Sequence, residues 1–359
     1  MSQMKKTALI MAGGRGERFW PRSRKQLPKQ FLSLTDDGKT MIQLTVERIL
    51  PLVDMQDIYI ATNRDYLPLV QEQLADIPEE NIFCEPVGRN TAPCIAVGAA
   101  LISRKYEDAI MMVLPSDHLI RYNGMYQTTL KDACEVAEMG EDLVTVGITP
   151  DHAETGYGYI RFLSDTGKGR AFAVDRFVEK PSLEKAKEYL AGDDYLWNSG
   201  MFLWKISSVM KRFEELMPEV YKGAMEIRDA FDAGNGEEVL QRIFPTFPSI
   251  SIDYGIMEKS QNIYTIPGTF GWDDVGSWLA VERIRKSNEA GNIVDGNAIT
   301  IDTKNCIIQA QGKLIATVGL KDLIIVDTED ATLICEKEST ADIKKILENL
   351  RICNRNEYL

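Results

Sequence analysis

The stretch TALIMAGGRGERFWPRSRKQLPKQF, residues 7–31, joins a short apolar run to a loop rich in glycine and in cationic side chains. The apolar run is too brief for the hydrophobic region of a secretory signal and is typical of a buried strand. Gly13, Gly14 and Gly16 follow it, and glycines at such a place let backbone N–H groups approach an anion closely. Residues 15–29 hold six cations and one acid, and the repulsion among the cations costs energy unless an anion relieves it. The stretch therefore predicts a strand followed by a phosphate-binding loop.

The charge and composition of the chain limit its partners. Its 359 residues carry a formal net charge of −13, which argues against a nucleic-acid partner, whereas a small anion responds mainly to local cations. No apolar run approaches the roughly 20 residues of a membrane span, which argues against a membrane partner. Six cysteines are scattered without a C-x-x-C pair, as is typical of reduced thiols in a cytoplasmic protein. The only histidines, His118 and His152, are too few for a His-rich zinc site.

Short apolar runs alternate with longer amphipathic segments over roughly the first two hundred residues. Strand-like runs such as AIMMVLP (109–115) and DLVTVGI (142–148) are separated from others by helical patterns such as TAPCIAVGAALISRKY (91–106). This alternation predicts an α/β fold, with a Rossmann-like, mainly parallel sheet flanked by helices. Ligands of such sheets lie beyond the carboxyl ends of the strands, so the loops AGGRGER and PSDH are the first candidates for a site.

The pattern changes at about Gly291, where short β-branched runs are broken by Gly, Asp and Asn. Such runs predict stacked short strands in a small β-helix-like domain. A helical pattern returns in TADIKKILENLRI, residues 340–352. We therefore expect two domains, residues 1–290 and residues 291–359, with a terminal helix in the second.

Two common nucleotide-binding loops fit the opening stretch poorly. The dinucleotide fingerprint G-x-G-x-x-G requires a third glycine where Phe19 stands, and Asp36 lies in a loop rather than at the strand end of a ribose-binding acid. A Walker A loop would end at GKT (38–40), but Ser33 replaces its first glycine. A tight turn with solvated arginines is the structural alternative, and the crowding of cations disfavours it.

Seven further motifs follow this loop, in the order FCEPVGRNTAPCIA, VLPSDHLI, ETGYGYI, FVEKP, WNSGMFLW, IDYGIMEKS and GWDDVGSW. Together with the loop they resemble the signature of the sugar-1-phosphate nucleotidyltransferases, and in particular of the mannose-1-phosphate guanylyltransferase family. The resemblance covers almost all of the N-terminal three quarters of the chain. It implies transfer of GMP from GTP to α-D-mannose 1-phosphate, with GDP-mannose and pyrophosphate as products and with Mg²⁺ or another divalent cation as cofactor.

Other functions stay open on the residues alone. The same fold and mechanism could use another NTP or another sugar 1-phosphate, such as glucose 1-phosphate, because residue types do not report hydroxyl stereochemistry. An NAD-linked oxidoreductase is disfavoured by the missing third glycine. A non-catalytic nucleotide-sugar-binding protein would be expected to lose Lys29, Asp117, Lys180 or Asp274, and all four are present.

The implied reaction needs positioning and charge neutralisation rather than a protein base. A phosphate monoester is already largely dianionic at neutral pH, with a second pKa of about 6, so it can attack the α-phosphate of GTP directly. The resemblance implies catalytic roles for Arg18, Lys29, Asp117 and Asp274. It also makes Asp117 and Asp274 the metal ligands, since hard cations prefer carboxylate oxygens and take substrate phosphates as further ligands. Asp273 is the alternate for Asp274.

The motif EPVGRNTAP bears on the base of the nucleotide. Guanine presents a ring N–H and an amino group that adenine lacks on that edge, and Glu85 and Asn90 are the candidates to meet them. Asn90 with Thr91 is also suited to cap the following helix, and both roles are compatible. The resemblance implies a nucleotide-binding set of Ala12, Gly13, Gly14, Arg15, Gly16, Glu85, Asn90, Thr91, Ser116 and Asp117.

A second group of motifs is expected on the sugar side. The resemblance implies that Lys180 grips the sugar phosphate while Glu179 accepts from sugar hydroxyls, although a solvated Glu–Lys pair is the ordinary alternative. The amide of Asn198 can both donate to and accept from vicinal hydroxyls, and a turn asparagine is its alternative. The backbone at Gly158 can come close to a sugar, unless it is simply a bend in a strand. Asp253 resembles a further sugar-side acid.

The segment from Gly291 onward resembles the short β-helical tail of this family, which often mediates self-association. Its β-branched runs with exposed edges predict a homodimer. Longer family members carry an isomerase domain beyond this tail. Because the chain stops at Leu359, we expect transferase activity alone.

Overall fold

The computed structural model describes residues 4–14, 16–178 and 180–359. Arg15 and Glu179, both expected in the site, lie outside the described residues.

The chain folds into two compact units, each built from segments that are separated in the sequence. The first unit comprises Met1–Gly13, Val46–Ser116 and Ile120–Trp272. The second unit comprises Gly14–Thr45, Asp117–Leu119 and Asp273–Leu359. Gly14 and Gly16 of the glycine loop therefore belong to the same unit as the C-terminal strands, whereas Gly13 belongs to the first unit.

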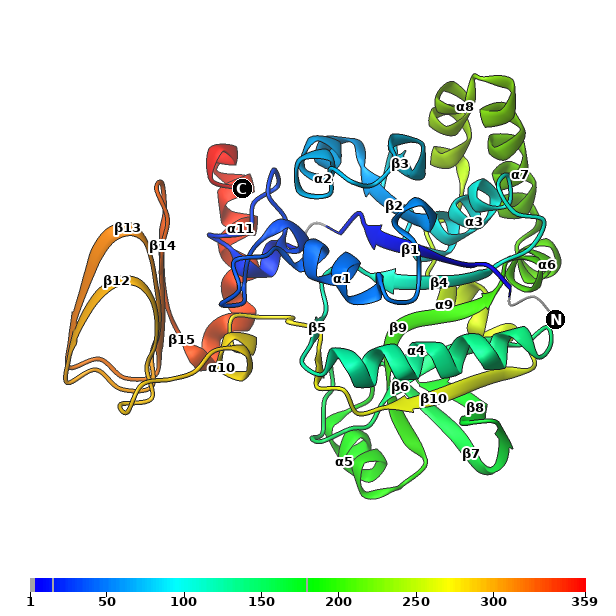
Figure 1. Ribbon diagram of the computed structural model, residues 1–359. Helices are drawn as coiled ribbons and strands as arrows, with labels where there is room; N and C mark the ends of the chain where they lie inside the picture. Colours follow the sequence, from blue (N-terminus) through cyan, green and yellow to red (C-terminus); the bar gives the residue numbers. More distant parts are fainter. Residues whose placement is uncertain (1–3, 15, 179) are drawn as a thin grey trace. The chain divides into compact units, whose positions relative to one another are not determined.

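A mixed sheet forms the centre of the first unit, and its described strands follow the order β3-β2-β1-β4-β9-β6-β10-β8-β7 (Figure 1). Pairing is parallel through β3, β2, β1 and β4 and between β6 and β10, whereas β9 runs antiparallel to β4, β6 and β7. The α/β prediction is confirmed, but hydrophobic periodicity carries no information on strand direction, so the antiparallel entry of β9 was not foreseen. The bounds are β1 (Lys6–Ala12), β2 (Ile58–Asn63), β3 (Ile82–Glu85), β4 (Ile110–Pro115), β6 (Leu143–Ile148), β7 (Tyr159–Lys168), β8 (Ala171–Val178), β9 (Tyr195–Lys205) and β10 (Ile263–Gly268).

Helices follow most of these strands. No helix of the described residues has both the length and the apolar character that crossing a bilayer demands. The helices are α1 (Met41–Ile49), α2 (Leu67–Gln73), α3 (Thr91–Ile102), α4 (Asn123–Glu138), α5 (Leu183–Ala191), α6 (Ile206–Leu216), α7 (Pro218–Ala233), α8 (Gly236–Ile243), α9 (Ile252–Gly255), α10 (Ala280–Ile284) and α11 (Ile343–Ile352). Two short strands, β5 (Leu119–Ile120) and β11 (Trp272–Asp273), pair with each other.

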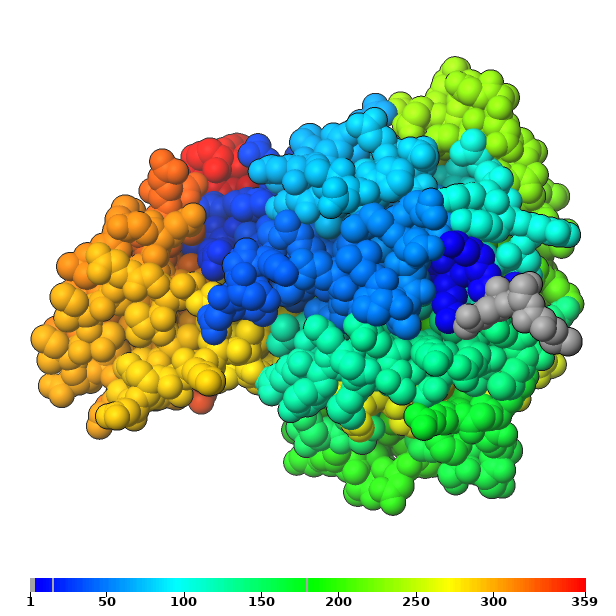
Figure 2. Space-filling model, viewed as in Figure 1, coloured from blue at the N-terminus to red at the C-terminus, as the bar shows by residue number. Residues whose placement is uncertain are grey.

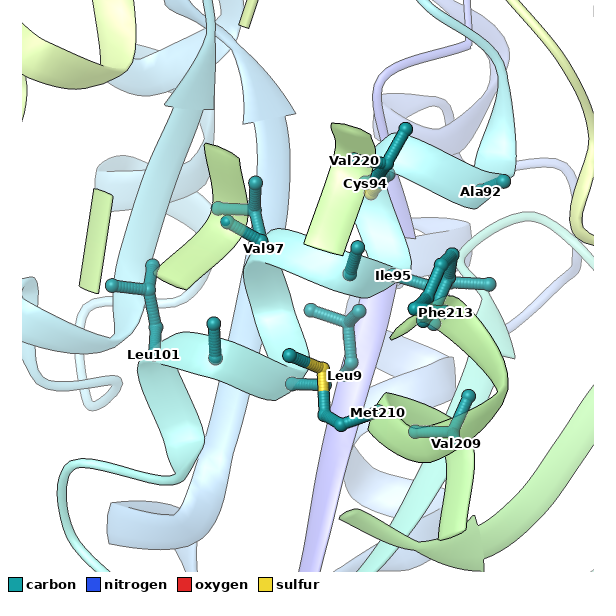
Figure 3. Packing of buried hydrophobic residues seen from close by; sticks show 14 of the residues in the cluster. Leu9, Ala92, Cys94, Ile95, Val97, Leu101, Val209, Met210, Phe213 and Val220 are labelled. Atoms are coloured by element: carbon teal, nitrogen blue, oxygen red, sulfur yellow. The ribbon is translucent and has the colours of Figure 1, made fainter. Parts of the chain in front are cut away.

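Helix α3 lies in the larger core of the first unit, and its small residues allow it to approach the sheet closely. A Cβ at Gly98 would lie 2.6 Å from Cδ2 of Leu9, so a larger residue would displace the Leu9 side chain where α3 crosses β1. Figure 3 shows Leu9 beneath α3, with Met210 and Phe213 of α6 beside the same helix. This packing holds β1, and with it the start of the glycine-rich stretch, in the centre of the unit.

The two faces of the sheet are covered by different helices. Leu9, Met111 and Val113 belong to the core that contains α3, α6 and α7. Side chains alternate along a strand, so the buried residues between them, Ile10 and Met112, point to the opposite face. Helix α4 packs against β4, β6, β9 and β10 and covers that face. A sheet covered on both sides is what the buried, continuous apolar runs predicted.

The second unit contains the predicted stack of short strands. Its sheet has the order β12-β13-β14-β15, in which the first three strands are parallel and β15 is antiparallel. Figure 2 shows the outer surface of this segment in yellow and orange. The bounds are β12 (Ile293–Ile301), β13 (Ile307–Val318), β14 (Leu323–Asp327) and β15 (Thr332–Glu336).

Aromatic residues anchor the glycine loop in this second unit. Phe19, Trp20 and Trp278 share one core with apolar residues of β12 to β15 and α11. The indole Nε1 of Trp278 donates to the backbone oxygen of Trp20 at 3.0 Å, and Nε1 of Trp20 donates to the backbone oxygen of Tyr358 at 2.7 Å. The loop is therefore fixed by residues from the far end of the chain.

Candidate active site

The glycine loop of the second unit comes into close contact with Lys29. Gly16 has a φ of 56°, in the left-handed region that favours glycine. A Cβ at Gly16 would lie 2.6 Å from the backbone N of Lys29, so a larger residue would push the two segments apart. Nε2 of Gln30 donates to the backbone oxygen of Gly14 at 2.8 Å. Gly14, Gly16 and Lys29 are thus held in one turn.

Lys29 connects three motifs of the second unit. Its side chain is buried, and its Nζ donates to Oδ2 of Asp117 at 2.8 Å and to the backbone oxygen of Asp274. A buried ammonium requires partners of this kind, because its desolvation is otherwise costly. The structure therefore brings together Lys29, Asp117 and Asp274, which the sequence predicted as catalytic residues.

Asp117 stays ionised although burial opposes its charge. Burial raises the pKa of its carboxyl, but the ammonium of Lys29 and then the imidazole of His118 outweigh burial and hold the pKa below its usual value of 3.8. The side chain of Asp117 is 35% exposed, and it lines a cavity together with His118. Asp117 therefore offers a negative charge to a ligand at neutral pH.

The motif GWDDVGSW gives its two aspartates different surroundings. Asp273 is buried, and Arg283 of α10 donates to both of its carboxylate oxygens, from Nη2 to Oδ1 at 2.9 Å. Asp274 lines the cavity, and its Oδ1 accepts from the N–H of Gly276 at 3.0 Å. This geometry favours Asp274 over Asp273 as a ligand-binding residue.

Arg18 faces the same loop. Its Nη1 donates to the backbone oxygen of Gly276 at 3.3 Å. A Cβ at Gly276 would lie 2.6 Å from Oδ2 of Asp274 and 3.2 Å from Nη1 of Arg18, so glycine leaves room for both side chains. Arg18 and Asp274 therefore lie side by side, one of each charge.

These residues line a cavity of about 920 Å³ within the second unit. Its volume lies at the upper end of the range for small-molecule sites, about 300–1,000 Å³. The wall consists of Gly16, Glu17, Arg18, Phe19, Lys29, Asp117, His118, Asp274, Val275, Gly276, Ser277, Thr340, Ala341, Ile343, Lys344, Leu347 and Arg351.

Part of this wall was missed from the sequence. Lys344 and Arg351 come from helix α11, and Arg351 forms an ion pair with Glu17 at 2.7 Å. The sequence predicted TADIKKILENLRI only as a terminal helix. Its lysines and arginine have the spacing of an ordinary solvated face, and the one available signal was their charge.

Few side chains of the cavity could bind a metal ion. No group of three or more His, Cys, Asp or Glu side chains gathers as a metal site in residues 4–14, 16–178 and 180–359. Asp117 and Asp274 provide two carboxylates in one cavity. Two carboxylates suit a hard cation that keeps substrate phosphates and water among its ligands.

Glu85, in the first unit, is a buried acid with a raised pKa. It ends β3, it is 8% exposed, and its Oε1 has no hydrogen-bond partner among the described residues. Burial raises the pKa of its carboxyl to about 7, although a hydrogen bond with Cys94 acts in the other direction. A Cβ at Gly13 would lie 2.7 Å from Oε2 of Glu85, so this predicted pair is in close contact.

The other predicted nucleotide-binding residues of the first unit lie at strand and helix ends. Asn90 has a φ of 65° and caps α3, with its Oδ1 accepting from the N–H of Thr91 at 2.9 Å. Thr91 Oγ1 accepts from the N–H of Ile252 at 2.8 Å. Ala12 ends β1, and the N–H of Ser116 donates to the backbone oxygen of Met11 at 3.2 Å.

Three predicted sugar-side residues meet in the first unit. Nδ2 of Asn198 donates to Oδ1 of Asp253 at 2.7 Å. The backbone N–H of Asn198 donates to the oxygen of Gly158 at 2.8 Å. Lys180 follows β8 with an exposed side chain and a φ of 44°. An asparagine held by an aspartate has its amide orientation fixed, as recognition of hydroxyls requires.

The chain resembles known proteins over its whole length. The family model described as Nucleotidyl transferase matches residues 7–290, and the model described as MannoseP isomerase/GMP-like beta-helix domain matches residues 296–350. The mannose-1-phosphate guanylyltransferase of Escherichia coli K12 is 39% identical over 368 residues, which cover 100% of this chain and 76% of that protein. The enzyme of the same name from Salmonella montevideo is 39% identical over 98% of this chain and 75% of its own length. A solved structure described as mannose-1-phosphate geranyltransferase from Thermus thermophilus is 34% identical, with a TM-score of 0.86 over 97% of this chain and 100% of that chain.

Proposed function

Because the chain belongs to the nucleotidyl transferase family, and within it to the mannose-1-phosphate guanylyltransferases, we propose that it transfers GMP from GTP to α-D-mannose 1-phosphate. The products are GDP-mannose and pyrophosphate. The observation that carries this proposal is the contact of Lys29 with the Asp117 carboxylate and the Asp274 backbone, in a cavity beside the glycine loop. This set of charges suits a nucleoside triphosphate, and the relatives indicate which triphosphate and which sugar.

The transfer balances without a co-reactant. An oxygen of the sugar phosphate forms a bond to the α-phosphorus of GTP, while the bond from that phosphorus to the β-phosphate oxygen breaks. Pyrophosphate carries away the electron pair. The attacking monoester is largely dianionic, with a second pKa of about 6, so no protein group has to remove a proton. Lys29 and Arg18 stabilise the charge that moves toward the leaving group.

Asp117 and Asp274 are the residues that would hold Mg²⁺ or another divalent cation. Asp117 is ionised at neutral pH, and both carboxylates border one cavity, which fits a hard cation. When bound, such a cation neutralises part of the triphosphate charge. The hydrogen bond from Nζ of Lys29 to Oδ2 of Asp117 holds the Asp117 carboxylate in position.

Glu85 is our candidate for reading the guanine base. Its carboxylate can accept from both donors of guanine, and its unpaired buried Oε1 provides an acceptor for one of them. Adenine offers no such donor pair, so it would leave this acid unsatisfied. Asn198, Asp253 and the Gly158 backbone are the candidates for the sugar hydroxyls, and Lys180 for the sugar phosphate.

The wider setting is also proposed. We assign residues 1–290 to the catalytic domain and 291–359 to the β-helical domain, which the family matches at 7–290 and 296–350 support. We expect a cytoplasmic homodimer. Ile299, Ile301 and Val318 support self-association, because they are 54%, 54% and 67% exposed on neighbouring parallel strands. Sedimentation analysis tests the dimer.

A labelling experiment tests the reaction type. With GTP labelled at the α-phosphorus, we expect the label in GDP-mannose; with GTP labelled at the γ-phosphorus, we expect it in pyrophosphate. Label from the γ-phosphorus in a sugar product would indicate a kinase and would overturn the proposal. The same holds if GTP is consumed equally fast without sugar phosphate.

A further inference from the structure

The loop that presents Asp274 has an unfavourable backbone conformation. Val275 has a φ of 48°, a left-handed value that β-branched residues rarely adopt. Its side chain is fully buried in the core of the second unit, so the loop cannot simply relax into the extended region. Something else in the structure has to stabilise this turn.

Asp273 supplies that stabilisation. Its Oδ1 accepts from the backbone N–H of Val275 at 2.8 Å. The hydrogen bond spans the residue between them, Asp274, and closes a turn around it. Because the bond is buried and its acceptor is charged, it resists competition from water.

Arg283 in turn holds Asp273. It donates to both carboxylate oxygens, and the carboxylate is only 9% exposed, while the guanidinium side chain is 47% exposed. A buried carboxylate without its cation would carry a large desolvation cost. The fork of an arginine also fixes the plane of the carboxylate, which a lysine would not do. The rotamer of Asp273, and through it the turn, therefore depends on Arg283.

From these contacts we propose that Arg283 is a positioning residue for Asp274. Arg283 orients Asp273, Asp273 fixes the backbone at Val275, and this turn directs Asp274 into the cavity that Lys29 and Asp117 also line. The inference rests on the proposed function, in which Asp274 binds a divalent cation. It assigns a share in metal binding to a side chain that is not among the residues lining the cavity.

The test compares two arginines of the same segment. Arg283→Met removes the fork on Asp273. Arg285→Met is the matched control, because Arg285 pairs with Asp295 at 2.8 Å and with Asp36 at 3.5 Å rather than with Asp273 or Asp274. For each variant, the Mg²⁺ concentration for half-maximal rate, the KM for mannose 1-phosphate and the melting temperature are measured. Mn²⁺ binding in the presence of GDP-mannose is followed from the spin-resonance signal of free Mn²⁺.

We expect Arg283→Met to raise the half-maximal Mg²⁺ concentration and the Mn²⁺ dissociation constant at least fivefold, with little change in the KM for mannose 1-phosphate. Arg285→Met should lower the melting temperature but leave both metal constants within twofold of wild type. Equal metal constants for the two variants would overturn the proposal. Arg283→Lys keeps the charge without the fork and should shift the metal constants less, so it replaces Arg283→Met if that variant does not fold. Wild-type metal constants in both Arg283→Lys and Asp273→Asn would also overturn the proposal.

Asp274→Asn separates this proposal from the proposed function. Loss of metal binding in Asp274→Asn, with normal metal binding in Arg283→Met, would contradict the positioning role alone. Normal metal binding in Asp274→Asn would contradict the metal site itself, and the positioning role with it.

Discussion

At the scale of single residues, neighbours in the chain can have opposite roles. Asp273 and Asp274 are both aspartates of one motif, yet Asp273 is buried against Arg283 while Asp274 borders the cavity. The family resemblance implied that an acid is needed here, and it favoured Asp274 while keeping Asp273 as the alternate. The partner that separates them lies ten residues further on, where no sequence signal marks it.

The carboxylates of Asp117 and Asp274 should be needed for turnover rather than for folding. Asp117→Asn and Asp274→Asn should each lower kcat about 10²–10³-fold. Each removes a carboxylate that would bind the divalent cation, and the cation stabilises the negative charge that develops on the phosphates. Pyrophosphate release at saturating substrates gives kcat, and far-ultraviolet circular dichroism checks the fold. A near-normal rate with Mg²⁺ in either variant would contradict the metal assignment.

Glu85 should make stability depend on pH. Its pKa is about 7 in the folded protein, against a usual value of 4.5, so the folded state binds more protons than the unfolded state between these pH values. Stability is therefore lost as pH rises through this window, by at most about 3.5 kcal/mol at roughly 1.4 kcal/mol per pKa unit. Glu85→Gln lacks this titration, so its free energy of unfolding should rise relative to wild type from pH 5 to pH 8. If the free energies of unfolding in urea changed with pH in the same way for wild type and Glu85→Gln, the raised pKa of the buried Glu85 carboxyl would be contradicted.

At the scale of elements, sequence reasoning succeeded where the signal is local. The strand ending at Pro115 and the helix capped by Asn90 are present as β4 and α3. The direction of β9 and the contact of α11 with the glycine loop could not be predicted from the sequence, because both depend on segments far apart in the chain. The position of α11 nevertheless affects the site, since it adds cationic side chains to the cavity wall.

Helix α11 offers a matched pair of lysines. The side chain of Lys344 lines the cavity and forms no ion pair or hydrogen bond with any described residue. Lys345, by contrast, pairs with Asp342 at 2.9 Å. Lys344→Ala should raise the KM for GTP and the inhibition constant of pyrophosphate about three- to tenfold, because it removes a positive charge near the phosphates. Lys345→Ala should leave both constants within twofold. Steady-state kinetics measures them, and equal effects of the two changes would contradict a role for Lys344.

At the scale of the whole molecule, the second unit joins both ends of the chain. The glycine loop shares a core with the C-terminal strands through Phe19, Trp20 and Trp278. The sequence indicated that aromatic residues follow the glycines, but an aromatic side chain does not specify its packing partner. The motifs predicted which residues gather around Lys29 and Asn198, since each motif carries its own chemistry. The residues that hold the site residues in place, such as Arg283 beside Asp273, were identified only from the three-dimensional structure.

The central claim concerns which nucleotide and which sugar phosphate react. The most direct measurement is initial pyrophosphate release over a grid of GTP, ATP, UTP and dTTP against mannose 1-phosphate and glucose 1-phosphate, with Mg²⁺. We predict the highest kcat/KM for GTP with mannose 1-phosphate, and a large loss with ATP, because adenine leaves Glu85 unpaired. A preference for ATP or dTTP with glucose 1-phosphate would contradict the account.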